Sequence, residues 1–169
     1  LTPDTSILEP IHAWFSHKGW SPQQFQREAW QAHLAGHSGL IQVPTGSGKT
    51  YAAVMAPMAE MLAAAPAREG IQLLYITPLR ALSRDLASAL EEPIKTMNWP
   101  LRVGIRNGDT STTERNRQIK TPPQILITTP ESLCVLLASR HAKSLFAAVT
   151  TVVLDEWHEL IASKRGTQT

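Results

Sequence analysis

Short runs of apolar residues alternate along this chain with longer segments whose apolar residues recur at helical spacing. Four mostly apolar runs, at residues 71–76, 101–105, 124–128 and 149–154, predict strands, and the run at 71–76, bounded by Gly70 and Pro78, is typical of a buried parallel strand. A shorter run at 40–43 predicts one more strand, which comes first in the chain. Strands that alternate with helices predict an α/β fold with a mostly parallel sheet and helices on both faces.

Two helical patterns precede the first of these strands. Apolar residues between 7 and 15 are spaced so that they share one face of a helix. A second helix is expected to begin with Ser21 as its N-cap, Pro22 at the first helical position and Gln24 as the capping-box partner. We therefore expect residues 1–35 to form a helical segment ahead of the sheet.

A glycine-containing loop follows the run at 40–43 and leads into an alanine-rich helical segment. Strand, glycine loop and helix in this order suit phosphate binding, because a helix N-terminus offers free N–H groups and the positive end of the helix dipole. The glycines allow close approach of the backbone, the lysine supplies a charge for phosphate, and the final threonine can ligate Mg²⁺. The residues predicted to bind ATP here are Thr45, Gly46, Ser47, Gly48, Lys49 and Thr50.

Three further polar segments follow predicted strands, at residues 77–82, 106–115 and 129–133. Ligands of open α/β sheets bind at the carboxyl ends of the strands, so these loops are candidates for binding a phosphate backbone. Each segment also has a purely structural interpretation. Arg80 suits the exposed first turn of a helix, and Thr129 or Ser132 suits a helix cap.

Two adjacent carboxylates come directly after the last apolar run. A carboxylate at a strand end can hold Mg²⁺ through its water shell, which is the role predicted for Asp155. Its neighbour Glu156 can orient or deprotonate an attacking water. Together with the phosphate loop, the pair predicts hydrolysis of a nucleoside triphosphate.

The composition limits the class of protein. The chain has 169 residues, of which 43% are hydrophobic and 18% charged, as in an ordinary globular domain. A net charge of +2 permits nucleic-acid binding without arguing for it. The single cysteine, Cys134, excludes a disulfide framework and favours a reducing compartment. Without a long apolar segment or a basic leader, a soluble, cytoplasmic protein is expected.

Taken in order, these motifs resemble the first RecA-like motor domain of a superfamily two helicase. Trp20, Phe25 and Gln26 are similar to the motif with which these helicases recognise adenine. The phosphate loop departs from the common pattern by having Val43 where a glycine is usual, and it resembles the helicase loop in this respect. The segment at 155–160, Asp-Glu-Trp-His-Glu-Leu, resembles the Lhr ("large helicase-related") type. The tryptophan in this segment, and the residues at 108–110 and 114–115, resemble the DNA-ligase-associated DEXH-box subgroup of that type.

The resemblance implies a role for each matching residue. Gln26 would recognise adenine, Lys49 and the loop amides would bind the phosphates of ATP, and Thr50 and Asp155 would hold Mg²⁺. Glu156 would be the catalytic base, and His158 would link the ATP site to the nucleic-acid side. The residues that would grip the backbone of one nucleic-acid strand are Pro78, Arg80, Thr110, Arg115 and Thr129.

The resemblance also implies what the chain works with. Family members move 3′ to 5′ along single-stranded DNA, often in repair, and a DNA ligase or a nuclease is an implied partner. They continue with a further strand and a second RecA-like domain that supplies an arginine to the ATP site. Residues 1–169 would therefore be the C-terminally incomplete first domain, with helices at 1–35 and the ATPase core at 40–169. Alone, this part is expected to bind nucleotide weakly and to hydrolyse little.

Three other functions remain open at this point. The nearest is a helicase of the same superfamily that acts on RNA, because no residue here distinguishes a 2′-hydroxyl. A small-molecule kinase on a phosphate-loop fold would leave the 155–158 segment and Gln26 unexplained. A non-catalytic binding module is disfavoured by the intact Lys49, Asp155 and Glu156.

Overall fold

The computed structural model of the chain describes residues 5–65, 68–78 and 80–156. The chain divides into two compact units, Leu1–Ala67 and Arg68–Thr169.

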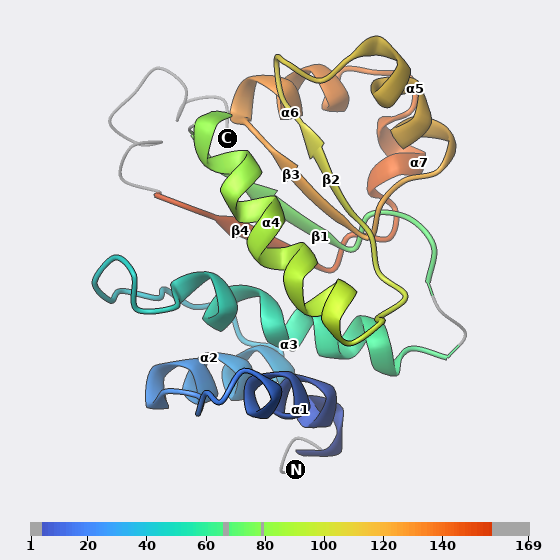
Figure 1. Ribbon diagram of the computed structural model, residues 1–169. Helices are drawn as coiled ribbons and strands as arrows, with labels where there is room; N and C mark the ends of the chain where they lie inside the picture. The colour runs from blue at the N-terminus through green and yellow to red at the C-terminus, as the bar shows by residue number, and fades with distance from the viewer. Residues whose placement is uncertain (1–4, 66–67, 79, 157–169) are drawn as a thin grey trace. The chain divides into compact units, whose positions relative to one another are not determined.

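The first unit is helical. A 3-10 turn, η1 (Thr5–Leu8), leads into α1 (Glu9–His17), which is followed by α2 (Gln24–Leu34) and α3 (Lys49–Ala63) (Figure 1). Helix α3 packs against α1 and α2, and its central turns are almost entirely buried. The side chains of this core with no measurable exposure include Ile11, Trp14, Trp30, Val54, Met55 and Met58.

Helix α2 begins later than its sequence predicted. The N-cap is Gln23, whose N–H donates to Oε1 of Gln26 at 2.9 Å, and the two glutamines form a reciprocal capping box. The prediction of a cap at Ser21 with Gln24 as its partner is therefore wrong. Gln26, three residues after Gln23, completes the capping box and satisfies a free backbone N–H at the start of the helix, so the helix begins after Gln23.

The strand predicted at 40–43 does not form. These residues have no regular secondary structure, and the Leu40 side chain is 67% exposed. A strand needs a hydrogen-bonded neighbour, and all the strands of the described sheet lie after residue 70 and pair with one another. An apolar run alone gave no information about whether such a neighbour would be present.

The second unit contains the sheet. Its strands are β1 (Leu73–Ile76), β2 (Val103–Arg106), β3 (Ile125–Thr128) and β4 (Thr151–Leu154), in the spatial order β2-β3-β1-β4. All three pairings are parallel, with Leu73 opposite both Ile125 and Thr151. The prediction of a parallel sheet is confirmed, and the four later runs are its strands.

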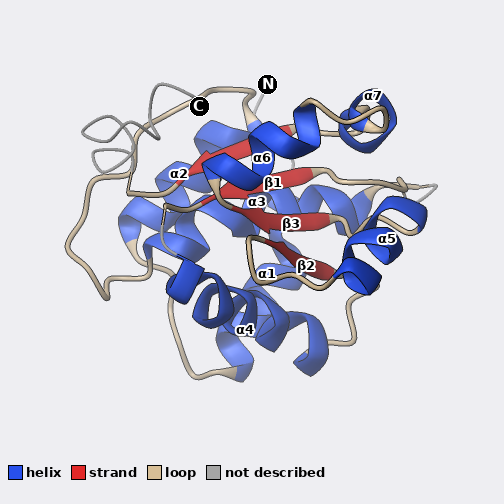
Figure 2. Ribbon diagram, turned by 90° about the horizontal axis from the view of Figure 1, so that it is seen from above, coloured by secondary structure: helices blue, strands red, loops and turns tan. Residues whose placement is uncertain are grey.

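Helices cover both faces of this sheet, as predicted. Helix α4 (Arg80–Thr96) packs on β2 and β3 from one side. Helices α6 (Pro130–Leu137) and α7 (Ala142–Phe146) pack on the other side, where their buried apolar side chains form a cluster with those of the strands (Figure 2). Helix α5 (Thr112–Lys120) contributes Ile119 to this cluster. Strands β1 and β3 are buried along their whole length, so the core lies on both sides of them.

Strand β4 lies at one end of the strand order, and two of its side chains, Val152 and Leu154, are 53% and 49% exposed. Because all four strands run in the same direction, their carboxyl ends lie along one edge of the sheet. The loops that leave this edge begin at Thr77, Asn107, Thr129 and Asp155. Among the described helices, none is both long and apolar enough to span a membrane.

Candidate functional site

In the first unit, the glycine loop opens α3 as the sequence predicted. Gly46 and Gly48 have φ angles of 82° and 89°, which side chains with a Cβ rarely adopt. Between them, Ser47 closes a turn: its N–H and its hydroxyl both donate to the carbonyl oxygen of Pro44, at 3.3 and 2.6 Å. Gly48 is the N-cap of the helix. The loop therefore has a backbone conformation that needs glycine at two positions.

Lys49 and Thr50 are the first two residues of α3. The backbone N–H of Ala52 donates to the Gly48 carbonyl at 3.2 Å, and the N–H groups before it precede the first intrahelical bond. These N–H groups and the helix dipole favour an anion, and the lysine adds a full positive charge. This end of α3 has the chemistry of a phosphate site.

Helix α2 holds the loop through its two capping glutamines. Gln23 Nε2 donates to the Ser47 carbonyl at 3.4 Å, and Gln26 Nε2 donates to the Gly48 carbonyl at 3.2 Å. Gln26 is only 4% exposed, and its Oε1 accepts from the Gln23 N–H. Both ends of the Gln26 amide are thus engaged within the protein, so recognition of adenine would require these bonds to be exchanged. The role of Gln23 had no signal in the sequence.

An aromatic cluster lies beside the start of α3. The Tyr51 ring centroid is 5.0 Å from that of Trp14 and 6.2 Å from that of Trp20, and the Tyr51 carbonyl accepts a hydrogen bond from Trp30 Nε1 at 2.9 Å. Trp20 remains 45% exposed, with the Lys18 ammonium 5.1 Å from its ring centroid. The cluster anchors the helix turn that carries Lys49 and Thr50.

In the second unit, the two predicted carboxylates follow β4. The N–H of Asp155 donates to the Ile76 carbonyl at 2.9 Å, which continues the pairing with β1 by one residue. Oδ1 of Asp155 accepts the N–H of Glu156 at 3.0 Å. Glu156 has a φ of 47°, a left-handed conformation that costs a residue with a Cβ about 1–2 kcal/mol. Strain of this kind is often found at functional sites.

Two of the predicted nucleic-acid segments leave the same edge of the sheet. Pro78 follows β1 and is buried, and Arg80 is the first residue of α4. Thr129 follows β3 and is the N-cap of α6, where its Oγ1 accepts the N–H of Ser132 at 3.4 Å. Thr129 is 2% exposed, so capping is the role that its contacts show.

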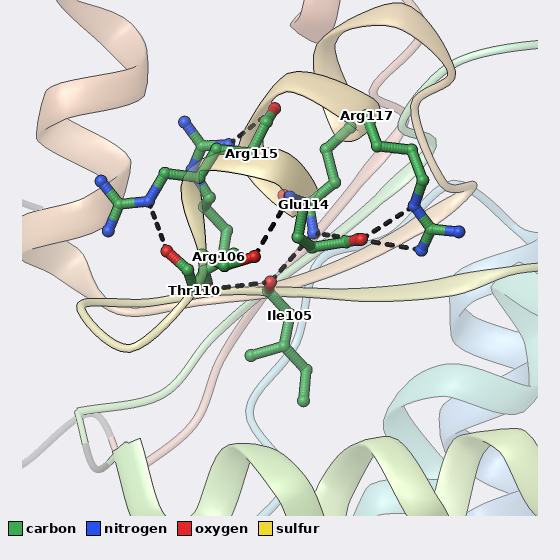
Figure 3. A network of polar contacts seen from close by, with 8 residues as sticks. Ile105, Arg106, Thr110, Glu114, Arg115 and Arg117 are labelled. Carbon is green, nitrogen blue, oxygen red and sulfur yellow. Dashed lines mark hydrogen bonds and ion pairs between the residues drawn. The ribbon is translucent and has the colours of Figure 1, made fainter.

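The third segment follows β2 and is held by a network of polar contacts (Figure 3). Thr110 Oγ1 donates to the Ile105 carbonyl at 3.2 Å, and Arg115 Nε donates to the Thr110 carbonyl at 2.8 Å. Arg106 Nη1 donates to the Arg115 carbonyl at 3.1 Å. Burial and the neighbouring Arg115 charge lower the pKa of the Arg106 guanidinium. Two arginines of like charge near one loop provide an environment that favours an anion.

The structure thus groups the predicted residues into two sets. The residues of the glycine loop that were predicted to bind ATP, and Gln26, belong to the first unit. Pro78, Arg80, Thr110, Arg115, Thr129 and the two carboxylates occur in or after the loops at the carboxyl edge of the sheet in the second unit. His158 lies outside the described residues. Arg106 and Asn107 lie in the predicted segment 106–115 but were not named individually as site residues, because their roles depend on contacts with the backbone of other residues.

Comparison with known proteins gives a consistent result. The family model described as DEAD/DEAH box helicase matches residues 23–169. A relative named Lhr helicase/probable uracil glycosylase, from Mycolicibacterium smegmatis, is 39% identical over 166 residues, covering 90% of this chain and 11% of the relative. The ATP-dependent helicase Lhr-Core protein 2 of Thermococcus barophilus is 38% identical over 176 residues, covering 95% of this chain and 20% of the relative.

Solved structures and one plant relative add to this. The Mycobacterium smegmatis helicase Lhr bound to ssDNA and AMP-PNP matches with a TM-score of 0.86 and 35% identity, over 95% of this chain and 21% of that one. The chloroplastic DExH-box ATP-dependent RNA helicase DExH15 of Arabidopsis thaliana is 35% identical over 149 residues, covering 85% of this chain and 11% of the relative.

The chain spans about one fifth or less of the length of these curated relatives. Its parallel sheet with helices on both faces is the fold of a RecA-like helicase domain, and it corresponds to the first such domain. The relatives and the structure named above include Lhr-type helicases of superfamily two. The match over residues 23–169 therefore shows that this chain belongs to the DEAD/DEAH box helicase family.

Proposed function

We propose that this chain is the ATP-binding motor domain of an Lhr-type DNA helicase or translocase, in which ATP hydrolysis drives movement on single-stranded DNA. The observation that carries the proposal is the loop before α3, where two glycines with positive φ place Lys49 and Thr50 at the N-terminus of a 15-residue helix. This conformation suits the phosphates of a nucleotide. The family match and the ssDNA and AMP-PNP named with the mycobacterial Lhr structure support the same function.

The proposed roles follow from the chemistry of each side chain. Lys49 supplies a point charge for the terminal phosphates, and the Thr50 hydroxyl and the Asp155 carboxylate are hard oxygen ligands suited to Mg²⁺. When bound, Mg²⁺ neutralises the charge that develops on the phosphate oxygens. Glu156 orients the attacking water and accepts its proton. Gln26 gives up its bonds to Gln23 and Gly48 in order to recognise adenine.

The carboxyl edge of the sheet is the proposed nucleic-acid side. The loops after β1, β2 and β3 begin at this edge and carry the residues that the resemblance assigns to nucleic acid. Support comes from Arg106, at the end of β2, and Arg115, in α5, whose neighbouring positive charges favour an anion near this edge of the sheet. We propose that His158 connects this side to the ATP site.

The remaining parts of the proposal concern the longer protein. We propose that residues 1–35 and 40–169 form, respectively, the adenine-reading helices and the ATPase core of the first RecA-like domain, and that a second such domain supplies an arginine to the ATP site. An arginine supplied in this way raises the rate of phosphoryl transfer by about 10³–10⁵. Membership of the DNA-ligase-associated subgroup, cytoplasmic work in DNA repair, and a ligase or nuclease partner are proposed on the resemblance of residues 155–160 and 108–115.

A helicase that acts on RNA is the second candidate, because one relative at 35% identity is named as an RNA helicase. Steady-state ATP hydrolysis by the full-length protein, with single-stranded DNA or RNA of matched sequence, separates the two. Stimulation by DNA and little by RNA is expected. Stimulation by RNA alone would show that the substrate is RNA and not DNA. ATP hydrolysis that neither nucleic acid changes would contradict a nucleic-acid motor.

A further inference from the structure

The turn between β2 and α5 is closed by its own hydrogen bonds. The N–H of Thr110 donates to the Asn107 carbonyl at 3.2 Å, and the N–H of Asp109 donates to Asn107 Oδ1 at 2.9 Å. The N–H of Asn107 in turn donates to Thr110 Oγ1 at 3.0 Å. Asn107 is buried, whereas Gly108 and Asp109 are exposed. The tip of the turn therefore faces solvent while its base is fixed.

Arg115, in α5, reaches back over this turn. Its Nε donates to the Thr110 carbonyl at 2.8 Å, and its Nη2 donates to the carbonyls of Asn107 and Gly108, each at 3.3 Å. A guanidinium has five N–H donors in a rigid plane. The three hydrogen bonds that Arg115 donates to this turn all end on backbone carbonyls. A lysine ammonium is a single point on a flexible stem and does not reproduce such a fork.

The backbone of Arg115 is itself held in place by β2. Arg106 Nη1 donates to the Arg115 carbonyl at 3.1 Å, and Gln118 Nε2 donates to the Ile105 carbonyl at 3.0 Å. The end of β2, the turn and α5 are thus tied together by side chains that bind backbone oxygens (Figure 3). The Arg115 guanidinium is a part of this connection, whereas Arg117, two residues later, pairs with Glu114 and is 73% exposed.

We infer that Arg115 is a positioning residue for nucleic-acid binding: it fixes the shape of the turn at 107–110, and the exposed backbone of that turn, not the Arg115 charge, meets the strand. The inference rests on the proposed function, since it concerns how that function uses this loop. It differs from the role that the resemblance implied for Arg115, which was to grip the backbone of the strand itself. Thr110 belongs to the same support, because its hydroxyl is bonded to Ile105 and Asn107.

The test compares Arg115→Lys and Arg115→Ala with Arg117→Ala in the full chain. Arg115→Lys keeps the charge and removes the fork, and Arg117→Ala removes the same charge as Arg115→Ala from the same helix without touching the turn. Hydrogen exchange of the Asp109 and Thr110 amides reports the turn in the absence of nucleic acid. Binding of a single-stranded oligodeoxynucleotide at several salt concentrations reports the interface.

A positioning role predicts that Arg115→Lys and Arg115→Ala behave alike. Both should speed exchange of the Asp109 and Thr110 amides by about tenfold or more, as expected for losing bonds to a charged donor. Both should weaken DNA binding to a similar extent. The slope of the logarithm of the binding constant against the logarithm of the salt concentration should be the same in both as in Arg117→Ala. Wild-type exchange and near-wild-type binding in Arg115→Lys would overturn the inference, especially if Arg115→Ala also lowered the salt slope by about 0.7, the value for one phosphate contact.

The two possible failures are distinguishable. If the proposed function is wrong, the wild-type chain shows no binding to DNA or RNA, and the role of Arg115 on nucleic acid is overturned with it. If only the inference is wrong, the wild type binds DNA normally and Arg115→Lys leaves both amide exchange and binding unchanged.

Discussion

The contact between α2 and the phosphate loop can be tested at Gly48. This residue has a φ of 89°, and a Cβ added to it would lie 2.7 Å from Nε2 of Gln26. Gln26 is 4% exposed, so its amide can move only by giving up its bonds to the Gly48 carbonyl and the Gln23 N–H. Gly48→Ala should therefore strain the backbone and also break the link between the helix and the loop.

The expected loss has two parts. The left-handed conformation costs an alanine about 1–2 kcal/mol. Displacing the Gln26 amide removes hydrogen bonds worth about 0.5–1.5 kcal/mol each. Gly46→Ala is a matched control, because Gly46 has a φ of 82° but no atom lies within 4 Å of the added Cβ. Gly46→Ala should thus cost about 1–2 kcal/mol, and Gly48→Ala, which also loses the two Gln26 bonds, about 2–5 kcal/mol.

The assay is urea unfolding followed by tryptophan fluorescence, since three of the five tryptophans, Trp14, Trp20 and Trp30, lie in the first unit. A double-mutant cycle with Gln26→Ala isolates the contact, because truncating Gln26 removes the atom that the new Cβ would meet. In that background, Gly48→Ala should cost no more than Gly46→Ala. Equal costs of Gly48→Ala and Gly46→Ala in the wild-type background, or a coupling near zero, would refute the contact.

Three further predictions concern the second unit. Gly104→Ala should destabilise it by about 1–3 kcal/mol in thermal unfolding, because the new Cβ would lie 2.7 Å from the Pro123 ring; an unchanged melting temperature would contradict this. Thr129→Ala should cost about 1 kcal/mol by removing the cap of α6, and Thr129→Ser should restore it. A hydrogen bond from Arg117 lowers the pKa of Glu114. The stability that this bond adds is present above the unfolded-state pKa of the carboxylate and is lost as the pH falls below about 4. In Glu114→Gln, the free energy of unfolding should therefore vary less with pH in this range.

The sequence was sufficient for the features that depend on local pattern. The runs containing β1 and β3 are mostly apolar, and both strands are buried along their whole length, so their identity as central parallel strands was predictable. The parallel arrangement then requires that Thr77, Thr129 and Asp155 follow strands at the same edge. The conformation of the glycine loop was predictable for a similar reason, because the chemistry of its residues suits one backbone shape.

Features that depend on distant partners were not predictable. The run at 40–43 is as apolar as a strand, but strand formation depends on a neighbour that its own residues do not specify. Gln23 and Arg115 have polar side chains of ordinary appearance, and their roles arise because backbone carbonyls of a loop lie within reach. An arginine that is exposed to solvent and an arginine that holds a turn through its carbonyls look the same in the local sequence. Only the contacts in the folded structure distinguish the two roles.

Whether this chain is a nucleic-acid-driven ATPase is decided by ATP hydrolysis in the full-length protein, measured with and without single-stranded DNA in the wild type and in Glu156→Gln. We expect DNA to stimulate the wild type, and Glu156→Gln to retain ATP binding while hydrolysis falls by about 10²–10⁴-fold, the usual contribution of a general base. Hydrolysis that persists in Glu156→Gln, or that is unaffected by DNA and by RNA in the wild type, would contradict this expectation.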